Sequence, residues 1–352
     1  MKKNFKKAMY GLAASSLLFI SGCGGSSTSS SDSESKKLIV VSWGGDYQQA
    51  QKDAIFDPYV KETGVKLIED SPVDIGKLKA MVKNNNVEWD VVDVLGTDIP
   101  ILASEGLLEP IDYSIVNKSE MLDGTVQEFA VSVDLYANVL SYNEENLPNG
   151  KAPEDWKDFF DESKFPGRRA MEKTPVQTLE FALMADGVDP KGLYPLDVDR
   201  AFNKLDTIKK EIIWWDQRAQ VIQLLADKEV ILAAAPNGRI AAAAEKGQPL
   251  AFTFNQGILD HEAWVVPKGS KNKEEAMKFI AFASKAEQQA NLLKVIPYGP
   301  ANKNTFELMS EDYAIKLPTH PDNVDKQVMV DAQWWFENFD KVNDRFQQWL
   351  LE

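Results

Sequence analysis

The stretch that decides the fold runs from residue 38 to residue 68 and reads LIVVSWGGDYQQAQKDAIFDPYVKETGVKLI. Its first four residues are an apolar run typical of a buried strand. Residues 46–62 contain mainly helix formers and end at Thr63-Gly64, and residues 65–68 form a second strand-like run. Strand, helix and strand at this spacing predict parallel α/β packing with a right-handed crossover.

The same alternation continues along the chain, so we predict an α/β fold. Further strands are expected at residues 89–95, 137–142, 230–234 and 263–266. Helices are expected at residues 74–83, 153–160, 196–209, 219–227, 240–245 and 273–293. The 352 residues exceed what one hydrophobic core usually serves, which indicates two packed units.

The start of the chain is typical of a secretory signal. Residues 1–7 carry four Lys and no acid, and residues 8–20 form an apolar run that is too short to span a bilayer. The run leads into Ile20-Ser21-Gly22-Cys23, which resembles the lipobox of bacterial lipoproteins. The resemblance implies removal of residues 1–22 and lipidation of Cys23. The alternative is a plain secretory signal followed by a buried Cys.

Residues 23–37 contain almost no apolar side chains, so we expect a flexible tether. A folded body that begins near Leu38 would then be anchored to the membrane through lipid at Cys23. This places it in the periplasm or on the outer cell surface. The chain has one Cys, which excludes a disulfide within it.

Charge and motif content exclude several classes of protein. The net charge is −15, and without residues 1–22 it is 35 − 54 = −19, so a basic nucleic-acid surface is not expected. Two His and one Cys are too few for zinc clusters or Cys/His dyads, and phosphate-loop and nucleophile-elbow motifs are absent from the sequence. We therefore expect neither an enzyme, nor a cofactor, nor a metal, and interpret acid pairs such as Asp90 and Asp93 as structural or solvated.

Aromatic residues and glycines follow the first predicted strand. Trp43, Gly44, Gly45 and Tyr47 lie where that strand turns into the first helix. Ligands of open α/β sheets bind outside the carboxyl ends of strands, close to helix N-termini. We predict that these four residues contact a ligand; the alternative is a tight glycine turn with Trp43 in the core.

Long segments resemble the solute-binding proteins of polyamine (spermidine/putrescine)-type ABC importers. The segments cover residues 42–67, 139–171, 214–243, 261–284 and 296–302. The resemblance implies a type II periplasmic-binding-protein fold, in which two α/β lobes joined by crossing strands enclose a small ligand. It also implies a membrane permease and ATPase subunits as partners, and we expect the chain itself to be a monomer.

Mapped onto this chain, the first lobe would comprise residues 38–138 and 267–352, and the second would comprise residues 139–266. The crossing segments would lie near residues 139–142 and 264–267. A ligand that touches both lobes would stabilise a closed form over an open one. A ligand held by one lobe alone would not shift this equilibrium.

The resemblance also implies roles for single residues. Glu262 would bind an ammonium group, Tyr298 would face the cleft, and Trp43, Tyr47 and Trp215 could form walls around an apolar chain. Core packing is an equal alternative for each Trp. Thr97, which follows the third predicted strand, and Thr174 complete the predicted ligand-binding set.

Three departures from polyamine binders bear on the ligand. This chain has Thr174 and Gln177 where those proteins tend to place acids, and Pro236 where they often carry Trp. Arg239 would repel a multiply charged cation. With Arg239 on a carboxylate and Glu262 on an amine, the site would suit an ω-amino acid such as γ-aminobutyrate.

Alternatives remain at this point. Arg239 could face solvent or pair with Glu245. The protein could instead be a receptor for putrescine or spermidine proper, or an extracytoplasmic sensor without a transport role. An extracytoplasmic enzyme on the same scaffold would need a clustered acid, base and nucleophile.

Overall fold

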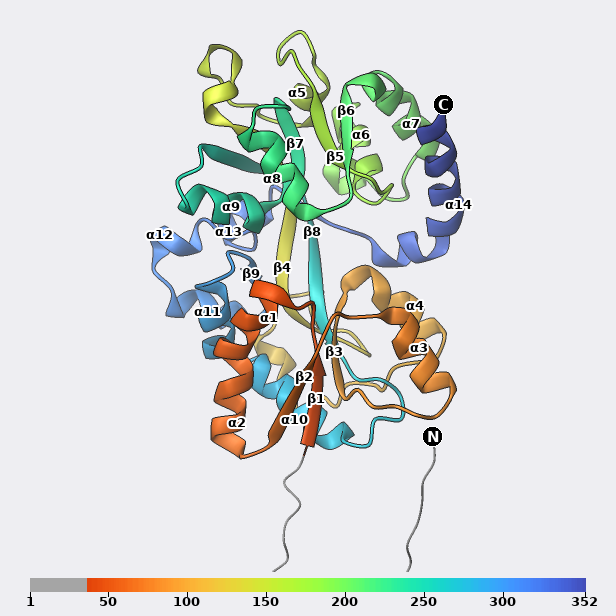
Figure 1. The fold of residues 1–352 in the computed structure, drawn as a ribbon, viewed down its shortest axis with the longest axis vertical. Helices are drawn as coiled ribbons and strands as arrows, with labels where there is room; N and C mark the ends of the chain where they lie inside the picture. Colours follow the sequence, from red (N-terminus) through yellow and green to blue (C-terminus); the bar gives the residue numbers. More distant parts are fainter. Residues whose placement is uncertain (1–36) are drawn as a thin grey trace, which may run out of the picture. The chain divides into compact units, whose positions relative to one another are not determined.

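A computed structural model describes residues 37–352. The predicted signal peptide, the lipidation site Cys23 and all of the predicted tether except Lys37 lie outside the described residues. Figure 1 shows two lobes connected by two long strands, β4 and β8. Within residues 37–352, no helix has the length and apolar character needed to cross a membrane.

One mixed sheet of ten strands runs through both lobes, in the order β2-β1-β3-β8-β4-β7-β5-β6, with β9 beside β4 and β10 beside β8. The strands are β1 (Lys37–Val41), β2 (Lys66–Asp70), β3 (Val91–Leu95), β4 (Val131–Asn143), β5 (Arg169–Glu172), β6 (Ile212–Trp215), β7 (Leu232–Pro236), β8 (Leu250–Val265), β9 (Gly299–Pro300) and β10 (Val328–Met329). The α-helices are α1 (Gly45–Gln51), α2 (Asp57–Thr63), α3 (Ile75–Lys83), α4 (Ile99–Ser104), α5 (Trp156–Phe160), α6 (Thr178–Ala185), α7 (Val198–Asp206), α8 (Arg218–Ala226), α9 (Asn237–Glu245), α10 (Lys273–Ala283), α11 (Ala286–Leu293), α12 (Glu311–Ala314), α13 (Pro321–Val324) and α14 (Ala332–Leu351).

Strands β4 and β8 belong to both lobes, and the change of lobe falls where Asn138 lies opposite Ile258. On one side of this point β8 pairs with β3, and on the other side β4 pairs with β7. We call the part that contains β1, β2 and β3 lobe 1, and the part that contains β5, β6 and β7 lobe 2. The predicted second crossing at residues 264–267 is wrong, because Trp264 lies in the lobe 1 core.

The faces of β3 determine which of its side chains reach the site. Val91 packs in a cluster with Phe56 and Phe279, whereas Val92 and Val94 pack in a different cluster with Leu102. Because side chains alternate along a strand, Asp93 shares the face of Val91. Its carboxylate therefore lies on the side of the sheet covered by α1, where Gln51 donates a hydrogen bond to it.

Helix α14 packs on lobe 2, although we predicted that residues 267–352 would belong to the first lobe. Its apolar stripe, Trp335, Val342, Phe346 and Trp349, lies in the same hydrophobic cluster as Phe202 of α7. Figure 1 shows α14 beside α6 and α7. The predicted boundary is thus wrong for the part of α14 that buries its apolar stripe against lobe 2, whereas the first turns of the helix also lie against α4 of lobe 1.

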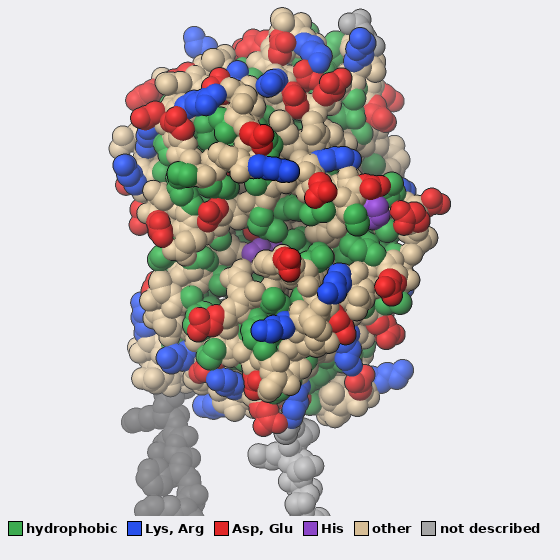
Figure 2. Space-filling view, turned by 180° about the vertical axis from the view of Figure 1, so that it is seen from behind, with side chains coloured by type: hydrophobic (Ala, Val, Ile, Leu, Met, Phe, Trp, Pro, Cys, Tyr) green, Lys and Arg blue, Asp and Glu red, His purple; other side chains and the backbone are tan. Residues whose placement is uncertain are grey.

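Figure 2 shows the opposite side of the molecule, with a furrow at mid-height where hydrophobic side chains are exposed. Acidic and basic side chains alternate over the rest of this face, without a continuous basic patch.

Candidate functional site

The turn between β1 and α1 forms one edge of the site. Gly44 has φ 77° and Gly45 has φ 60°, a left-handed conformation that glycine adopts without strain. The Gly44 N–H donates to the Gln48 Oε1 at 3.1 Å, which fixes the start of the helix. One residue earlier, Tyr47 points its hydroxyl into lobe 1, where it donates to Asp134 Oδ2 at 2.8 Å.

A cavity of about 620 Å³, which we call the large cavity, lies between this turn and the start of α9. Seven of the predicted ligand-binding residues line it, together with six others. The lining residues are Trp43, Gly44, Gly45, Asp46, Tyr47, Leu95, Glu172, Asp216, Gln217, Ala219, Arg239, Glu262 and Tyr298. Its volume falls within the range of small-molecule binding sites.

The lobe 1 wall of the large cavity is acidic and buried. Glu262 is 3% exposed, and Asp134 and Asp93 behind it are fully buried. Asp93 Oδ2 accepts a hydrogen bond from Gln51 Nε2 at 2.7 Å, and its Oδ1 has no hydrogen-bond partner among residues 37–352. Burial, with the negative charges of Glu262 and Asp134, holds the pKa of the Asp93 carboxyl well above its ordinary value.

The lobe 2 wall is more exposed. Arg239 lies in the first turn of α9 and is exposed, and within the described chain it forms no ion pair with Glu245 or any other acid. The exposed residues Asp216 and Gln217 follow β6. This wall therefore offers a guanidinium group that faces the cavity and is not paired with a carboxylate of residues 37–352.

The two walls meet at Asn237 and Gly238. The Asn237 side chain accepts from the Ala137 N–H at 2.9 Å and donates to the Pro297 carbonyl at 3.0 Å. A Cβ added to Gly238 would lie 2.4 Å from Tyr298 Cε1. Only glycine allows this contact, so the start of α9 is packed against the tyrosine of the opposite lobe.

Three tyrosine rings lie close together here: Tyr47 and Tyr298 line the large cavity, and Tyr136 lines the small cavity described below. The ring of Tyr298 lies 5.7 Å from that of Tyr136 and 6.4 Å from that of Tyr47, both tilted. Tyr298 is 4% exposed, so its position is fixed by packing. Such ring faces suit a short methylene chain and a nearby cation.

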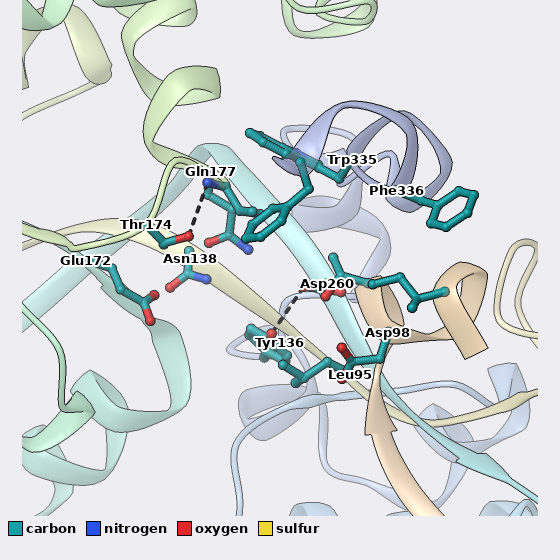
Figure 3. Close-up of a pocket in the computed structure, with 14 residues that line it drawn as sticks. Leu95, Asp98, Tyr136, Asn138, Glu172, Thr174, Gln177, Asp260, Trp335 and Phe336 are labelled. Atoms are coloured by element: carbon teal, nitrogen blue, oxygen red, sulfur yellow. Dashed lines mark hydrogen bonds between the residues drawn. The ribbon is translucent and has the colours of Figure 1, made fainter. Parts of the chain in front are cut away.

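A second cavity of about 300 Å³, the small cavity, adjoins the large one, and Leu95 and Glu172 line both. Thr97 and Thr174, also predicted to bind ligand, line the small cavity only. Figure 3 shows Trp335 and Phe336 of α14 on one side of it and Asp260 and Tyr136 below. The Tyr136 hydroxyl donates to Asp260 Oδ2 at 3.2 Å.

Trp215 lies elsewhere, which corrects our prediction that it walls the ligand. Its side chain is 1% exposed and packs in the hydrophobic cluster of lobe 2 that includes Val221 and Ile240. Its place on β6 turns it toward this core, and it lines neither of the two cavities. The alternative of core packing applies to this residue.

The structure also brings to the site residues that we did not predict. Asp134 and Asp93 had no recognisable motif, and the only available signal was an acid in an otherwise apolar strand. His261, between Asp260 and Glu262 in sequence, lines neither cavity, and burial lowers its pKa to about 4, so it is neutral at pH 7. No group of three or more His, Cys, Asp or Glu among residues 37–352 is arranged to hold a metal ion.

Comparison with known proteins identifies the family. Residues 54–319 match the family described as bacterial extracellular solute-binding protein, and the chain belongs to this family. The chain is 38% identical over 321 residues to the γ-aminobutyric acid-binding protein of Pseudomonas aeruginosa, covering 89% of this chain and 91% of the relative. It is 21% identical over 294 residues to the spermidine/putrescine-binding periplasmic protein of Escherichia coli, covering 80% and 82%.

Solved structures agree with the fold. A γ-aminobutyrate receptor, Atu4243, is 40% identical with a TM-score of 0.84, covering 90% of this chain and 98% of that one. An ABC transporter substrate-binding protein from Bradyrhizobium japonicum is 41% identical with a TM-score of 0.85, covering 90% and 99%. These findings confirm the predicted family, the two-lobed type II periplasmic-binding-protein fold and the function of a solute-binding protein; the relatives named are solute-binding proteins rather than enzymes.

Proposed function

We propose that this protein captures a small ω-amino acid of the γ-aminobutyrate type outside the cytoplasm and delivers it to an ABC permease. The observation that carries the proposal is the placement of Glu262 and Arg239 on opposite walls of one cavity. A ligand with a cationic and an anionic end would contact both lobes at once. Such a ligand stabilises the closed form, whereas a ligand that contacts one lobe does not.

The ammonium end would lie against lobe 1. Glu262 is a buried carboxylate in the cavity wall, and the rings of Tyr47 and Tyr298 lie beside it. A carboxylate removed from water binds an ammonium group more strongly than an exposed one does. The tyrosine rings would cover the methylene groups next to the nitrogen and attract the cation.

The carboxylate end would lie against lobe 2. Arg239 is the one basic residue among the described residues that line the large cavity. Its planar guanidinium suits bidentate binding of a carboxylate. Because Arg239 lies in the first turn of α9, the unpaired N–H groups of that turn and the positive end of the helix dipole favour an anion at the same place.

The names of relatives support this choice of ligand. Both the Pseudomonas aeruginosa relative and the Atu4243 receptor bear γ-aminobutyrate in their names and cover about nine tenths of the chain. A related structure, 36% identical with a TM-score of 0.77, was solved in complex with agropinic acid. The names and titles of similar proteins therefore include ligands that carry an acidic group.

A polyamine is the second candidate, and the small cavity favours it. Asp98, Glu172 and Asp260 line that cavity beside the aromatic rings of α14. A second ammonium group at the far end of a longer ligand would be attracted by these acids. Arg239 opposes this candidate, since it would repel a ligand without a carboxylate.

The remaining parts of the proposal rest on the sequence and the family. Lipid at Cys23 and the tether up to residue 37 would hold the lobes at the membrane surface, in the periplasm or on the outer cell surface. A permease with ATPase subunits would receive the closed form, and the receptor would act as a monomer. A receptor that signals to a sensor protein instead of a permease would use the same closure. A pull-down that identifies the partner protein distinguishes the sensing role from the transport role.

A ligand screen tests the proposal. We would measure the thermal unfolding of the protein with γ-aminobutyrate, β-alanine, taurine, putrescine and spermidine. A ligand at about 100 times its Kd stabilises the protein by about 2.7 kcal/mol, which raises the melting temperature by several degrees. We expect the largest shift with γ-aminobutyrate. A shift with diamines but not with ω-amino acids would contradict the proposal and favour the polyamine candidate.

A further inference from the structure

Three neighbouring strands bring three carboxylates together behind the lobe 1 wall of the large cavity. Asp93 lies on β3, Asp134 on β4 and Glu262 on β8, which runs between the other two. Glu262 is opposite Leu95 in one ladder and opposite Asp134 in the other. We call these three residues the carboxylate cluster.

The carboxylate cluster surrounds the Tyr47 hydroxyl. This hydroxyl donates to Asp134 Oδ2, and the charges of all three acids, after burial itself, raise the pKa of Tyr47 well above its ordinary value. Tyr47 and Glu262 also line the large cavity. The hydroxyl is therefore a neutral donor that connects the cavity to the buried acids.

Other polar and charged groups face the carboxylate cluster from β1, α1 and β8 and from the cavity. From β1 and α1, the Ser42 hydroxyl lies 3.5 Å from Asp93 Oδ2, and Gln51 donates to the same oxygen. On β8, Asp260 accepts from Tyr136 and from the His261 N–H. From the cavity side, Asp46, Glu172 and Asp216 are further acids, and Arg239 is a base on the far wall.

Asp93 has no cationic partner in the described part of the chain. Asp93 is fully buried, takes part in no ion pair within residues 37–352, and has one carboxylate oxygen without a hydrogen-bond partner in that part of the chain. Three negative charges packed this closely and removed from water repel one another strongly. The favourable ways to relieve the repulsion are a bound proton or a bound cation.

We propose that the carboxylate cluster holds a proton in the empty receptor and exchanges it for the ligand's ammonium group, so that Asp93 and Asp134 select cationic ligands together with Glu262. This inference rests on the proposed function, which places the ammonium group beside Glu262. The raised pKa of the Asp93 carboxyl agrees with it, because burial beside two other acids favours the protonated form of this group.

The exchange balances in charge and atoms. The ligand arrives with its amine already protonated, since the pKa of an alkylammonium group is near 10. The proton of the carboxylate cluster leaves to solvent, and no covalent bond of the ligand is formed or broken. The ammonium group then neutralises the charge that the proton had neutralised before.

The sign of the pH dependence follows. A proton that must leave on binding competes with the ligand, so affinity falls as pH is lowered through the apparent pKa of the carboxylate cluster. Where a full proton is displaced, the Kd changes by about tenfold per pH unit. An analogue without the amine, such as γ-hydroxybutyrate, has an uncharged hydroxyl at that end and cannot replace the proton, so its affinity should not show this dependence.

Isothermal titration calorimetry on the full chain tests the inference. We would titrate γ-aminobutyrate, or whichever amine of the screen binds, at pH 7 in phosphate and in Tris, which have different ionisation enthalpies. We expect the apparent binding enthalpy to differ between the buffers by an amount that corresponds to release of a proton. We also expect the Kd to increase from pH 8 to pH 5.

Substitutions of single acids test which residues of the carboxylate cluster hold the proton. In Asp93→Asn we expect proton release to be lost, the Kd for γ-aminobutyrate to rise about tenfold at pH 8, and the preference for γ-aminobutyrate over γ-hydroxybutyrate to shrink. Asp134→Asn is the second variant. Glu275→Gln is the matched control, because Glu275 is a buried lobe 1 acid that accepts from Tyr59 and lies away from the large cavity.

The outcomes are distinct. A binding enthalpy that is the same in both buffers, with a Kd independent of pH, overturns the inference while the proposed function stands. Unchanged proton release in Asp93→Asn and Asp134→Asn also overturns it. If neither variant folds, the two-buffer measurement on the unaltered protein still decides. Failure of every amine to bind overturns the proposed function and the inference together.

Discussion

The two walls of the large cavity differ in how they are built. On the lobe 1 wall, packing fixes the two side chains expected to hold the amine, since Glu262 and Tyr298 are both less than 5% exposed. On the lobe 2 wall, Arg239, Asp216 and Gln217 are exposed and follow strand ends or begin helices. One wall is preorganised, and the other can adjust.

This difference has an energetic meaning. Side chains that are already ordered lose little entropy when a ligand binds, so the lobe 1 wall should supply most of the affinity. An exposed arginine loses side-chain freedom and remains partly screened by water, so its contribution should be smaller. The lobe 1 wall would thus bind the amine, and the lobe 2 wall would discriminate among amines by their other end.

The largest effect is expected when the preorganised wall is changed. Glu262→Gln removes the charge that faces the ammonium group but keeps the shape, so every amine should bind about 3 kcal/mol more weakly, roughly a hundredfold in Kd. Calorimetry with γ-aminobutyrate and putrescine measures this. Unchanged affinity for both amines would remove Glu262 from the site.

A smaller and selective effect is expected on the other wall. Arg239→Ala should weaken the binding of γ-aminobutyrate by about 1–2 kcal/mol, roughly five- to thirtyfold in Kd, and leave the binding of putrescine unchanged or stronger. Arg200→Ala is the matched control, because Arg200 is an exposed lobe 2 arginine that pairs with Asp186 away from the cavity. An equal loss for putrescine and γ-aminobutyrate would disprove carboxylate recognition by Arg239.

The contact between the walls gives a third prediction. In Gly238→Ala the new methyl group would collide with the Tyr298 ring, which cannot move freely because it is packed between two other tyrosines. The closed form should lose about 1 kcal/mol relative to the open form, so ligands of every charge type bind several-fold more weakly. Calorimetry measures this loss, and Gly192→Ala, which has open space at that position, is the control.

The smallest expected effect is a change in stability with pH. It concerns a buried acid whose carboxylate accepts hydrogen bonds from other side chains. Glu180 in lobe 2 accepts from the Tyr194 hydroxyl and from Trp335 Nε1, both at 2.7 Å, and burial raises its pKa to about 7. A carboxyl whose pKa is raised on folding stabilises the folded state fully below its unfolded pKa, near 4.3. That stability is lost as pH rises toward 7.

Thermal unfolding from pH 5 to pH 8 checks this prediction. The melting temperature of the unaltered protein should fall by a few degrees more than that of Glu180→Gln, because the other acids titrate in both proteins. Ligand binding should be unaffected. Parallel pH curves for the two proteins would contradict the assignment.

Much of the fold could be predicted from the sequence, because strand and helix periods are local. The helix expected at residues 46–62 is present as α1, a π-helical turn at residues 52–56, and α2. The single helix expected at residues 273–293 is divided into α10 and α11 at Ser284-Lys285. The lobe that receives α14 could not be predicted, since either lobe could bury an amphipathic helix.

The site shows the same limit. Trp43, Tyr47 and Glu262 could be recognised because turns and family segments are contiguous in sequence. We interpreted both Asp90 and Asp93 as structural or solvated acids, but the structure gives them different environments. Asp90 accepts from the Ile39 N–H at 2.9 Å and from Ser270 Oγ at 2.7 Å, whereas Asp93 joins Asp134 and Glu262. Which face of a strand carries each acid depends on distant strands.

The attachment of α14 to lobe 2 has a practical use. Strand β1 starts at Lys37 in lobe 1, while α14 ends at Leu351, two residues after Trp349, which packs on Phe202 of lobe 2, so positions near Lys37 and Leu351 lie on different lobes. A pair of fluorescent labels there would convert the approach of the bodies into a change of energy transfer. The chain could thus serve as a genetically encoded optical reporter of its own solute.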